Sequence, residues 1–227
     1  MYTCLQFCSF KLFSRSWQRM IMSRINGTPT PIQLAKAALR KEITMRLANM
    51  TDGERERQSD IVTQKLLQLP KLRSSQRVSL YLNMTDEIQT IGILRHLLAS
   101  DHSCFIPHYS GSDMKMVQLK SWEDYLSLPE TKWKIKQPKD TDVRPDALET
   151  GGLDLILVPG LGFTRKGDRL GRGKGYYDSY IRKCEETGKR PLLIALAFYE
   201  QICDTIPVNE MDRAVDVVLF PEKDELN

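Results

Sequence analysis

The sequence predicts a three-layer α/β/α protein in which helices cover both faces of a mostly parallel central sheet. Apolar runs typical of buried strands alternate with helical patterns along most of the chain. The run at 153–160, LDLILVPG, is almost continuously apolar, as expected of a central strand that is covered on both faces. No internal repeat or low-complexity tract points to another architecture.

Two helices are expected before the first strand. Thr30 and Gln33 have the spacing of a capping box at the start of the first helix. Thr51 and Glu54 repeat that spacing at the start of the second helix, which Pro70 should end.

The first strand is expected at 77–84, and Thr85 or Asp86 can cap the helix that follows it. Two short strands should then form a hairpin around residues 111–113. A polar, proline-containing surface connection is expected at 132–150. The remaining elements are expected as strands at 153–160, 192–198 and 215–220 and a helix at 176–189.

The composition is that of an ordinary globular protein without a global charge field. Of 227 residues, 41% are hydrophobic and the net charge is +4. The first 30 residues hold four basic side chains and no acid, so the remaining 29 basic side chains balance the 29 acidic ones. A nucleic-acid partner usually requires a basic face, and no run of 18 apolar residues is present to span a membrane. Neither partner is therefore expected, and a monomer is expected.

The cysteines and the first 29 residues bear on the compartment. Five cysteines at irregular spacings without a CxxC pair favour a reduced compartment over a disulfide framework or a zinc site. Residues 1–29 are basic, acid-free and rich in bulky apolar residues, as in a mitochondrial transit peptide. A secretory signal is the weaker alternative, and a start at Met20 or Met22 is a third. We expect a leader at 1–29 and one domain at 30–227, in the cytoplasm, the mitochondrion or both.

The segment after LDLILVPG carries the strongest functional signal. From Gly160 the chain reads GLGFTRKGDRLGRGKGYYD, with six glycines in 16 residues. Glycines that alternate with Arg172 and Lys174 would expose backbone N–H groups beside two cations, which is an arrangement suited to polyphosphate. Asp178, at the start of the next helix, is placed to hold Mg²⁺ bound to that phosphate.

Two known phosphate-binding motifs do not match this segment. A Walker A loop would need glycine at position 168, where the chain has Asp168, and a dinucleotide fingerprint would need glycine in place of Arg165. A flexible basic hairpin or an RNA-contacting segment remains the alternative interpretation of the loop alone.

Four separated stretches resemble the 5-formyltetrahydrofolate cyclo-ligase family, also called methenyltetrahydrofolate synthetases. They are LDLILVPGLGFTRKGDRLGRGKGYYD, YLNMTDEIQT, ALAFYEQI and IPVNEMDRAVDVVLF, in an order that covers roughly residues 33 to 220. The resemblance implies a Rossmann-like fold of the NagB/RpiA/CoA-transferase type. It also implies an ATP- and Mg²⁺-dependent conversion of 5-formyltetrahydrofolate to 5,10-methenyltetrahydrofolate, with release of ADP and phosphate.

The resemblance also implies site residues at the matching positions. Catalytic roles fall to Arg172 and Lys174, and metal binding to Asp178 and Asp212. The implied nucleotide contacts are Lys36, Arg40, Arg169, Leu170, Gly171, Arg172, Gly173, Lys174, Gly175, Tyr176 and Tyr177. The implied folate contacts are Leu82, Glu87, Arg172, Gly173, Lys174, Gly175 and Tyr176.

Several of these residues have a plainer interpretation from the sequence alone. Lys36 and Arg40 lie four residues apart and would pass as a solvated helix face. Glu87 would pass as an acid near a helix N-terminus. Tyr109 and Trp133 are candidate stacking surfaces for the folate but are more often packing residues. The connection around 136–146 departs from the family pattern, which leaves the rim of the folate site open.

Two other functions are compatible with the predicted fold. One is another ATP-using or sugar-phosphate enzyme, because a fold does not determine a function. The other is an RNA-associated protein that uses residues 165–174 as a basic ribbon. Agreement of several separated motifs, rather than one loop, ranks the cyclo-ligase ahead of both.

Overall fold

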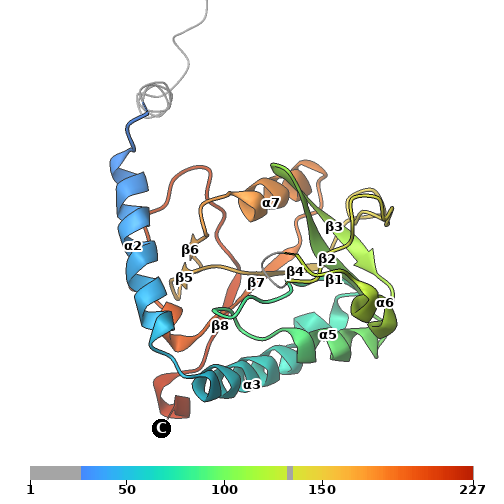
Figure 1. Ribbon diagram of the computed structural model, residues 1–227, viewed down its shortest axis with the longest axis horizontal. Coiled ribbons are helices and arrows are strands. Elements are labelled where there is room, and N and C mark those ends of the chain that lie inside the picture. The colour runs from blue at the N-terminus through green and yellow to red at the C-terminus, as the bar shows by residue number, and fades with distance from the viewer. Residues whose placement is uncertain (1–26, 132–134, 227) are drawn as a thin grey trace, which may run out of the picture.

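The computed structural model describes residues 27–131 and 135–226, and its centre is a six-stranded sheet (Figure 1). The strand order is β3-β2-β1-β4-β7-β8, in which only the edge strand β3 is antiparallel to its neighbour. The strands are β1 (Arg77–Ser79), β2 (Ser103–Ser110), β3 (Asp113–Leu119), β4 (Leu155–Val158), β7 (Leu192–Leu196) and β8 (Val217–Leu219). The prediction of a mostly parallel sheet is therefore confirmed.

Helices lie on both faces of this sheet. In Figure 1, α3 (Asp52–Gln68) and α5 (Ile91–Leu98) run along one face, and α7 (Tyr176–Glu186) lies on the other. The long helix α2 (Pro31–Ala48) stands at the side, next to the short hairpin of β5 (Gly162–Phe163) and β6 (Arg169–Leu170). The smaller helical elements are α4 (Pro70–Ser74), α6 (Trp122–Ser127), η1 (Tyr199–Gln201) and η2 (Lys223–Leu226).

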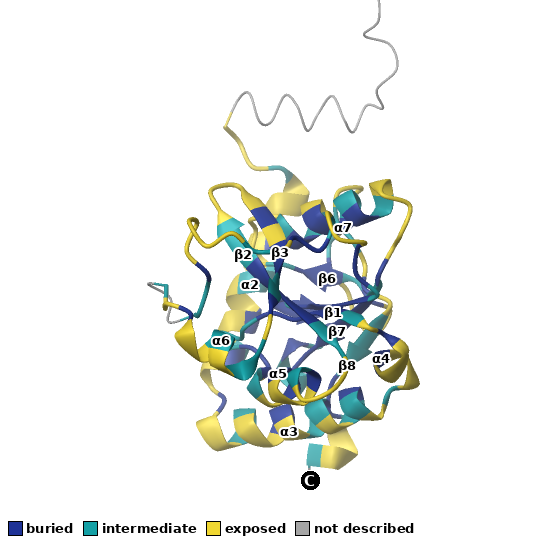
Figure 2. Ribbon diagram, turned by 90° about the vertical axis from the view of Figure 1, so that its right-hand side faces the viewer, coloured by how far each residue is buried: buried dark blue, intermediate teal, exposed yellow. Residues whose placement is uncertain are grey.

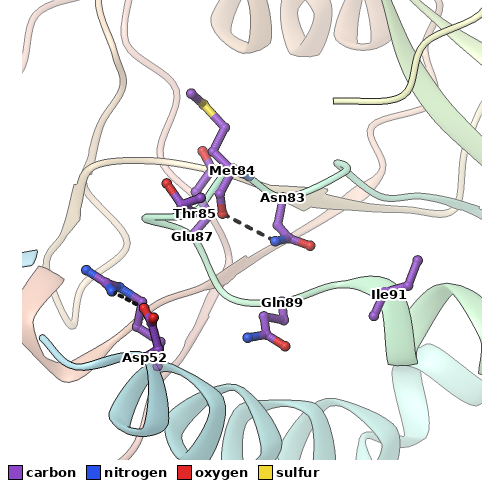
Figure 3. A pocket seen from close by; sticks show the side chains of 8 residues that line it. Asp52, Asn83, Met84, Thr85, Glu87, Gln89 and Ile91 are labelled. Atoms are coloured by element: carbon purple, nitrogen blue, oxygen red, sulfur yellow. Dashed lines mark hydrogen bonds and ion pairs between the residues drawn. The ribbon is translucent and has the colours of Figure 1, made fainter. Parts of the chain in front are cut away.

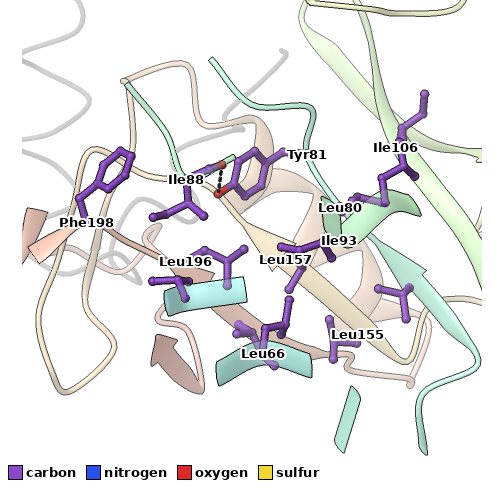
Figure 4. Packing of buried hydrophobic residues seen from close by; sticks show 14 of the residues in the cluster. Leu66, Leu80, Tyr81, Ile88, Ile93, Ile106, Leu155, Leu157, Leu196 and Phe198 are labelled. Atoms are coloured by element: carbon purple, nitrogen blue, oxygen red, sulfur yellow. Dashed lines mark hydrogen bonds between the residues drawn. The ribbon is translucent and has the colours of Figure 1, made fainter. Parts of the chain in front are cut away.

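Two apolar clusters, one on each face, hold the three layers together. Along β4, Leu155 and Leu157 face the cluster beneath α3 and α5, whereas Ile156 and Val158 face the cluster beneath α7. This alternation follows from the two-residue period of a strand. Figure 4 shows the first cluster, where Leu66 of α3 meets the sheet residues, and Figure 2 shows the buried strands at the centre of the molecule. The prediction that LDLILVPG is covered on both faces is confirmed.

The start of α2 agrees with its sequence signals. Thr30 accepts a hydrogen bond from the Gln33 N–H, and the Gln33 side chain accepts one from the Thr30 N–H at 2.7 Å. Thr51 likewise caps α3 by accepting from the Glu54 N–H. Pro70 ends α3 as expected but also begins α4, because its fixed φ suits a first helical position.

Thr30→Ala should lower the free energy of unfolding by about 1 kcal/mol, because the cap satisfies an N–H group that otherwise has no partner in the helix. Equilibrium denaturation in urea measures this effect. Thr28→Ala, at an exposed position two residues earlier, serves as the control and should leave the midpoint unchanged. Equal midpoints for the two variants would contradict this role of Thr30.

The segment after β1 differs from its prediction. The strand expected at 77–84 stops at Ser79, and the helix expected from residue 85 or 86 begins only at Ile91. Between these two elements, side chains accept hydrogen bonds from backbone N–H groups: the Met84 N–H donates to Glu87, and the Thr90 N–H donates to Asn83. Short polar side chains that bond nearby backbone groups compete with helix formation in this way.

The connection at 132–150 is only partly a surface segment. Residues 132–134, which include the candidate Trp133, lie outside the described residues. Toward the end of the connection, Ala147 is fully buried and donates its N–H to the Met116 carbonyl at 2.8 Å. This part therefore pairs with the outer edge of β3, which the polar sequence did not indicate.

Helix α6 is not among the predicted elements, and the predicted strands do not include β5 and β6. Most of the predicted leader, residues 1–26, lies outside the described residues. Within the described ranges, no helix is both long and apolar enough to cross a membrane.

Candidate functional site

The candidate site lies at the carboxyl ends of β1 and β4, where the order of strands reverses. The chain leaves β1 for β2 on one side of the sheet, whereas β4 leads to β7 on the other side. Ligands of open α/β sheets bind in the crevice at such a switch point. The two segments that meet there are residues 80–90, which follow β1, and residues 159–175, which we call the glycine loop.

The first half of the glycine loop is held by close packing. Gly167 has φ +97°, and a Cβ on it would lie 2.2 Å from the Val215 carbonyl oxygen. The Val215 N–H in turn donates to the Gly167 carbonyl at 2.9 Å. Gln201, which is fully buried, donates to the carbonyl oxygens of Gly160 at 2.8 Å and Leu161 at 3.2 Å. This half of the loop is thus a rigid base for the residues that follow it.

The second half of the loop presents charge and backbone to solvent. Residues 172–175 are exposed, and Gly173 and Gly175 have φ of +102° and +73°. Gly175 is the N-cap residue of α7, so no side chain caps that helix. A helix N-terminus with open N–H groups attracts anions. Lys174 is exposed beside it and pairs with no acid in the described part of the chain.

Arg172 joins the glycine loop to the segment after β1. Its Nη2 lies 2.7 Å from Asp86 Oδ1 and 3.2 Å from Glu87 Oε1. Glu87 is 7% exposed, and this burial raises the pKa of its carboxyl group, although Arg172 and the Met84 N–H oppose the rise. Asp86 and Glu87 also raise the pKa of Arg172 against the effect of burial, so the guanidinium stays charged.

The basic pair of α2 faces the site rather than solvent. Arg40 Nε donates to the Gly171 carbonyl at 2.8 Å, and a Cβ on Gly173 would lie 3.7 Å from the Arg40 guanidinium. Lys36 is only 8% exposed, and its Nζ lies 2.6 Å from both carboxylate oxygens of Asp212. The interpretation of Lys36 as part of a solvated helix face is therefore wrong.

Both candidate metal ligands already have cationic partners. Asp178 Oδ2 lies 2.7 Å from Arg169 Nη2, and Asp178 Oδ1 accepts from the Arg213 N–H at 3.0 Å. Arg213 directly follows Asp212, so the two carboxylates belong to adjoining segments. Among the described residues, no group of three or more His, Cys, Asp and Glu side chains is arranged to hold a metal ion.

Two of the predicted nucleotide contacts have buried side chains. Leu170 is 1% exposed and belongs to the core cluster beneath α3. Arg169 is 6% exposed and connects the Pro159 carbonyl to Asp178 across the loop. At these two positions only the backbone can reach a ligand directly.

Several tyrosines lie close to Glu87, on the side where Tyr109 packs against Tyr176. Tyr109 and Tyr176 have ring centroids 5.0 Å apart, and the Tyr176 hydroxyl donates to the Gly111 carbonyl at 2.8 Å. Burial raises the pKa of Tyr109 to about 12. The Tyr177 hydroxyl is buried next to that of Tyr109, and burial raises its pKa well above the ordinary value. The phenols of Tyr109 and Tyr177 therefore stay protonated near neutral pH and can donate hydrogen bonds.

Two pockets open beside the segment after β1. One, of about 280 Å³, lies between the start of α3 and this segment (Figure 3). It is lined by Asp52, Arg55, Asn83, Met84, Thr85, Glu87, Gln89 and Ile91. The second, of about 210 Å³, is lined by Leu82, Asn83, Thr90, Ile91, Tyr125, Glu130, Ile135 and Lys136. The two predicted folate contacts on this segment, Leu82 and Glu87, thus line different pockets.

One residue of this site and the pairing of several others are not indicated by the sequence. From the sequence, Asp86 is only a possible helix cap, yet its side chain binds Arg172. Its position next to Glu87 was the only available signal. The ion pair between Lys36 and Asp212 joins residues 176 apart in the chain, and no sequence pattern indicates such a partner.

These features define an α/β protein with an exposed cationic glycine loop and a buried carboxylate at its topological switch point. The family model described as the 5-formyltetrahydrofolate cyclo-ligase family matches residues 32–221, so the chain belongs to this family.

Similar proteins agree with this assignment. A mouse protein named 5-formyltetrahydrofolate cyclo-ligase is 46% identical over 84% of this chain and 96% of its own length. An Arabidopsis thaliana protein named 5-formyltetrahydrofolate cyclo-ligase, mitochondrial, is 28% identical over 82% of this chain and 74% of its own length. The solved structure of Aquifex aeolicus 5,10-methenyltetrahydrofolate synthetase aligns with a TM-score of 0.68 at 27% identity, covering 81% of this chain and 88% of that one.

Proposed function

We propose that this protein converts 5-formyltetrahydrofolate to 5,10-methenyltetrahydrofolate and that ATP drives the reaction, with release of ADP and phosphate. The observation that carries this proposal is the contact of Arg172 with Glu87. It places a buried carboxylate, suited to the N–H groups of a pterin, next to an exposed cationic loop suited to polyphosphate. A cyclo-ligase needs these two sites side by side, because the phosphoryl donor must reach the formyl oxygen.

The chemistry requires an oxygen to leave from an amide. The formyl oxygen attacks the γ-phosphorus of ATP, and the bond between that phosphorus and the β,γ-bridging oxygen breaks, which releases ADP. N10 then bonds to the formyl carbon and loses its proton. The carbon–oxygen bond breaks, and phosphate departs with the former formyl oxygen. No atom changes oxidation state, so positioning and charge stabilisation are the main tasks of the protein.

The nucleotide is assigned to the second half of the glycine loop. Lys174 supplies a cation that no acid in the described part of the chain neutralises, and the open N-terminus of α7 supplies backbone N–H groups. Arg40 lies against the same loop through Gly171. Together these groups balance the negative charge of a triphosphate.

Mg²⁺ is assigned to Asp178 and Asp212. A magnesium ion that accompanies ATP is usually held by one or two carboxylates and by the phosphates themselves, so two aspartates without a third acid fit this group. When bound, the ion neutralises charge on the phosphates. Asp212 would hold the ion beside Lys36, whose Nζ lies 2.6 Å from both of its carboxylate oxygens.

The folate is assigned to the side of Glu87 that holds the tyrosines. Glu87 accepts hydrogen bonds from the pterin, Tyr176 and Tyr109 offer ring surface, and Leu82 offers an apolar contact. Arg172 touches both substrates because it lies between the two segments.

A mixture of the protein, MgATP and 5-formyltetrahydrofolate tests the function directly. We expect the absorbance of the methenyl product to rise, with one ADP formed for each product molecule. Omission of either substrate is the control. A phosphorylated product would favour a kinase, and salt-sensitive RNA retention without folate-stimulated ATP turnover would favour an RNA-binding protein.

The compartment and assembly are part of the same proposal. We assign the protein to the mitochondrion, the cytoplasm or both, because residues 1–29 have the composition of a transit peptide. The enzyme is assigned as a monomer. Fluorescent fusions with and without residues 1–29 test the first assignment, and sedimentation tests the second.

A further inference from the structure

We infer that Asp86 is a positioning residue. Together with Glu87 it binds the Nε and Nη2 nitrogens of the Arg172 guanidinium, and the remaining nitrogen, Nη1, is thereby directed toward the formyl oxygen of the substrate. This inference rests on the proposed function and extends it to a residue outside the predicted site. Asp86 does not touch either substrate in this account and acts only through Arg172.

Counting donors supports the inference. A guanidinium has five N–H donors: one on Nε and two on each terminal nitrogen. Nε lies 3.3 Å from Glu87 Oε1, and Nη2 lies 3.2 Å from the same oxygen and 2.7 Å from Asp86 Oδ1. The two acids therefore engage three donors, one on Nε and two on Nη2. The two donors of Nη1 have no partner among the described residues and are available to a ligand oxygen.

The loop geometry explains why two consecutive acids reach one arginine. In a helix, the side chains of neighbouring residues point about 100° apart around the axis and do not face one another. Residues 80–90 are irregular instead, because the Asn83 and Glu87 side chains bond backbone N–H groups. The departure from the predicted helix is thus the feature that lets Asp86 and Glu87 converge on Arg172.

Arg172 needs such an anchor because its own surroundings give it little support. It lies between Gly171 and Gly173, and its side chain is 35% exposed. A long side chain in this setting loses considerable rotamer entropy when it is held in one orientation. Glu87 alone leaves the Nη2 end with a 3.2 Å contact, whereas Asp86 adds the shorter 2.7 Å contact there. Charge-assisted contacts of this length are the strong ones.

The test is the Asp86→Asn variant, which keeps the size of the side chain and removes its charge. We expect kcat to fall roughly tenfold, while the KM for ATP changes by less than about threefold, because substrate binding does not use Asp86. Asp216→Asn is the matched control: Asp216 pairs with Arg190 at 2.9 Å just before β8, at the amino end of that strand and away from the site, and kcat should stay unchanged. Asp86→Glu should restore part of the lost rate.

A second measurement separates positioning from a merely structural role. In the Arg172→Ala background, Asp86→Asn should cause no further loss, measured in single turnovers with enzyme in excess. The inference is overturned if Asp86→Asn leaves kcat unchanged, or if its effect is equally large with and without Arg172. A wild-type protein that forms no methenyl product would instead overturn the proposed function, so the two failures are distinguishable.

Discussion

Lys174→Ala is expected to lower kcat by roughly a thousandfold, the scale seen when one charge-stabilising donor is removed from an acyl- or phosphoryl-transfer site. The Lys174 ammonium group pairs with no acid in the described residues and lies beside the open N-terminus of α7. Because it is exposed, its removal should change the free energy of unfolding by less than about 0.5 kcal/mol. The variant should therefore lose most of its activity while its stability stays nearly unchanged.

Lys166→Ala provides the matched control for Lys174. Lys166 is an exposed lysine of the same glycine loop, in the tight turn between β5 and β6, and it is not part of the proposed site. Steady-state kinetics and thermal unfolding of both variants make the comparison. An enzyme that keeps near-wild-type rates without Lys174, or loses as much rate without Lys166, would contradict the assignment.

Glu87→Gln is expected to lower kcat/KM for 5-formyltetrahydrofolate roughly a hundredfold. The glutamine can still accept from the Met84 N–H, but it no longer provides a charge for Arg172 or a strong acceptor for the pterin. Burial raises the pKa of Glu87 above its ordinary value of 4.5, so the ionised carboxylate is less favourable in the folded chain than in the unfolded one. The variant should therefore unfold at an equal or higher temperature than the wild type.

The raised pKa of Glu87 also determines how stability and kcat/KM should change with pH. Because the folded pKa is above the unfolded one, protonation of Glu87 stabilises the folded state as pH falls below the folded pKa. Protonation also removes the charge that holds Arg172, so kcat/KM of the wild type should fall on the acid side at a pH above 4.5.

The Glu87→Gln variant should lack that acid limb in its pH profile. Parallel profiles of kcat/KM against pH for the two enzymes check this expectation. An unchanged acid limb in the variant would show that another group controls it, and a large loss of thermal stability would show that Glu87 is mainly structural.

The layered fold was predictable because its central strand is apolar on both of its faces. In β4 every residue is buried, and alternate side chains enter opposite clusters, which the apolar run LDLILVPG indicates. The start of α2 was predictable because Thr30 and Gln33 bond one another's backbone locally. These signals lie within a few residues of the elements they specify, so a single sequence contains them.

The segment after β1 was not predictable for the opposite reason. Its conformation depends on Glu87 and Asn83 side chains that bond backbone groups and on the distant Arg172. A helical pattern and this irregular loop use the same apolar residues, and only the tertiary contacts decide between them.

In the candidate site, too, local features were predictable from the sequence and long-range contacts were not. The glycine loop was recognisable from its composition alone, and the resemblance pointed to Lys36, Arg40 and Glu87. Neither indicated which charges neutralise one another. The pairs of Lys36 with Asp212 and of Arg172 with Glu87 join residues 176 and 85 apart in the chain, respectively. Such partners are visible only once the chain has folded.

A crystal structure with a non-hydrolysable ATP analogue, Mg²⁺ and 5-formyltetrahydrofolate would show whether the glycine loop holds the triphosphate beside the folate. We expect a phosphate oxygen within about 3 Å of Lys174 Nζ and the γ-phosphorus next to the formyl oxygen, with the pterin hydrogen-bonded to Glu87. A triphosphate bound at another place in the molecule, away from Lys174 and the start of α7, would contradict this expectation.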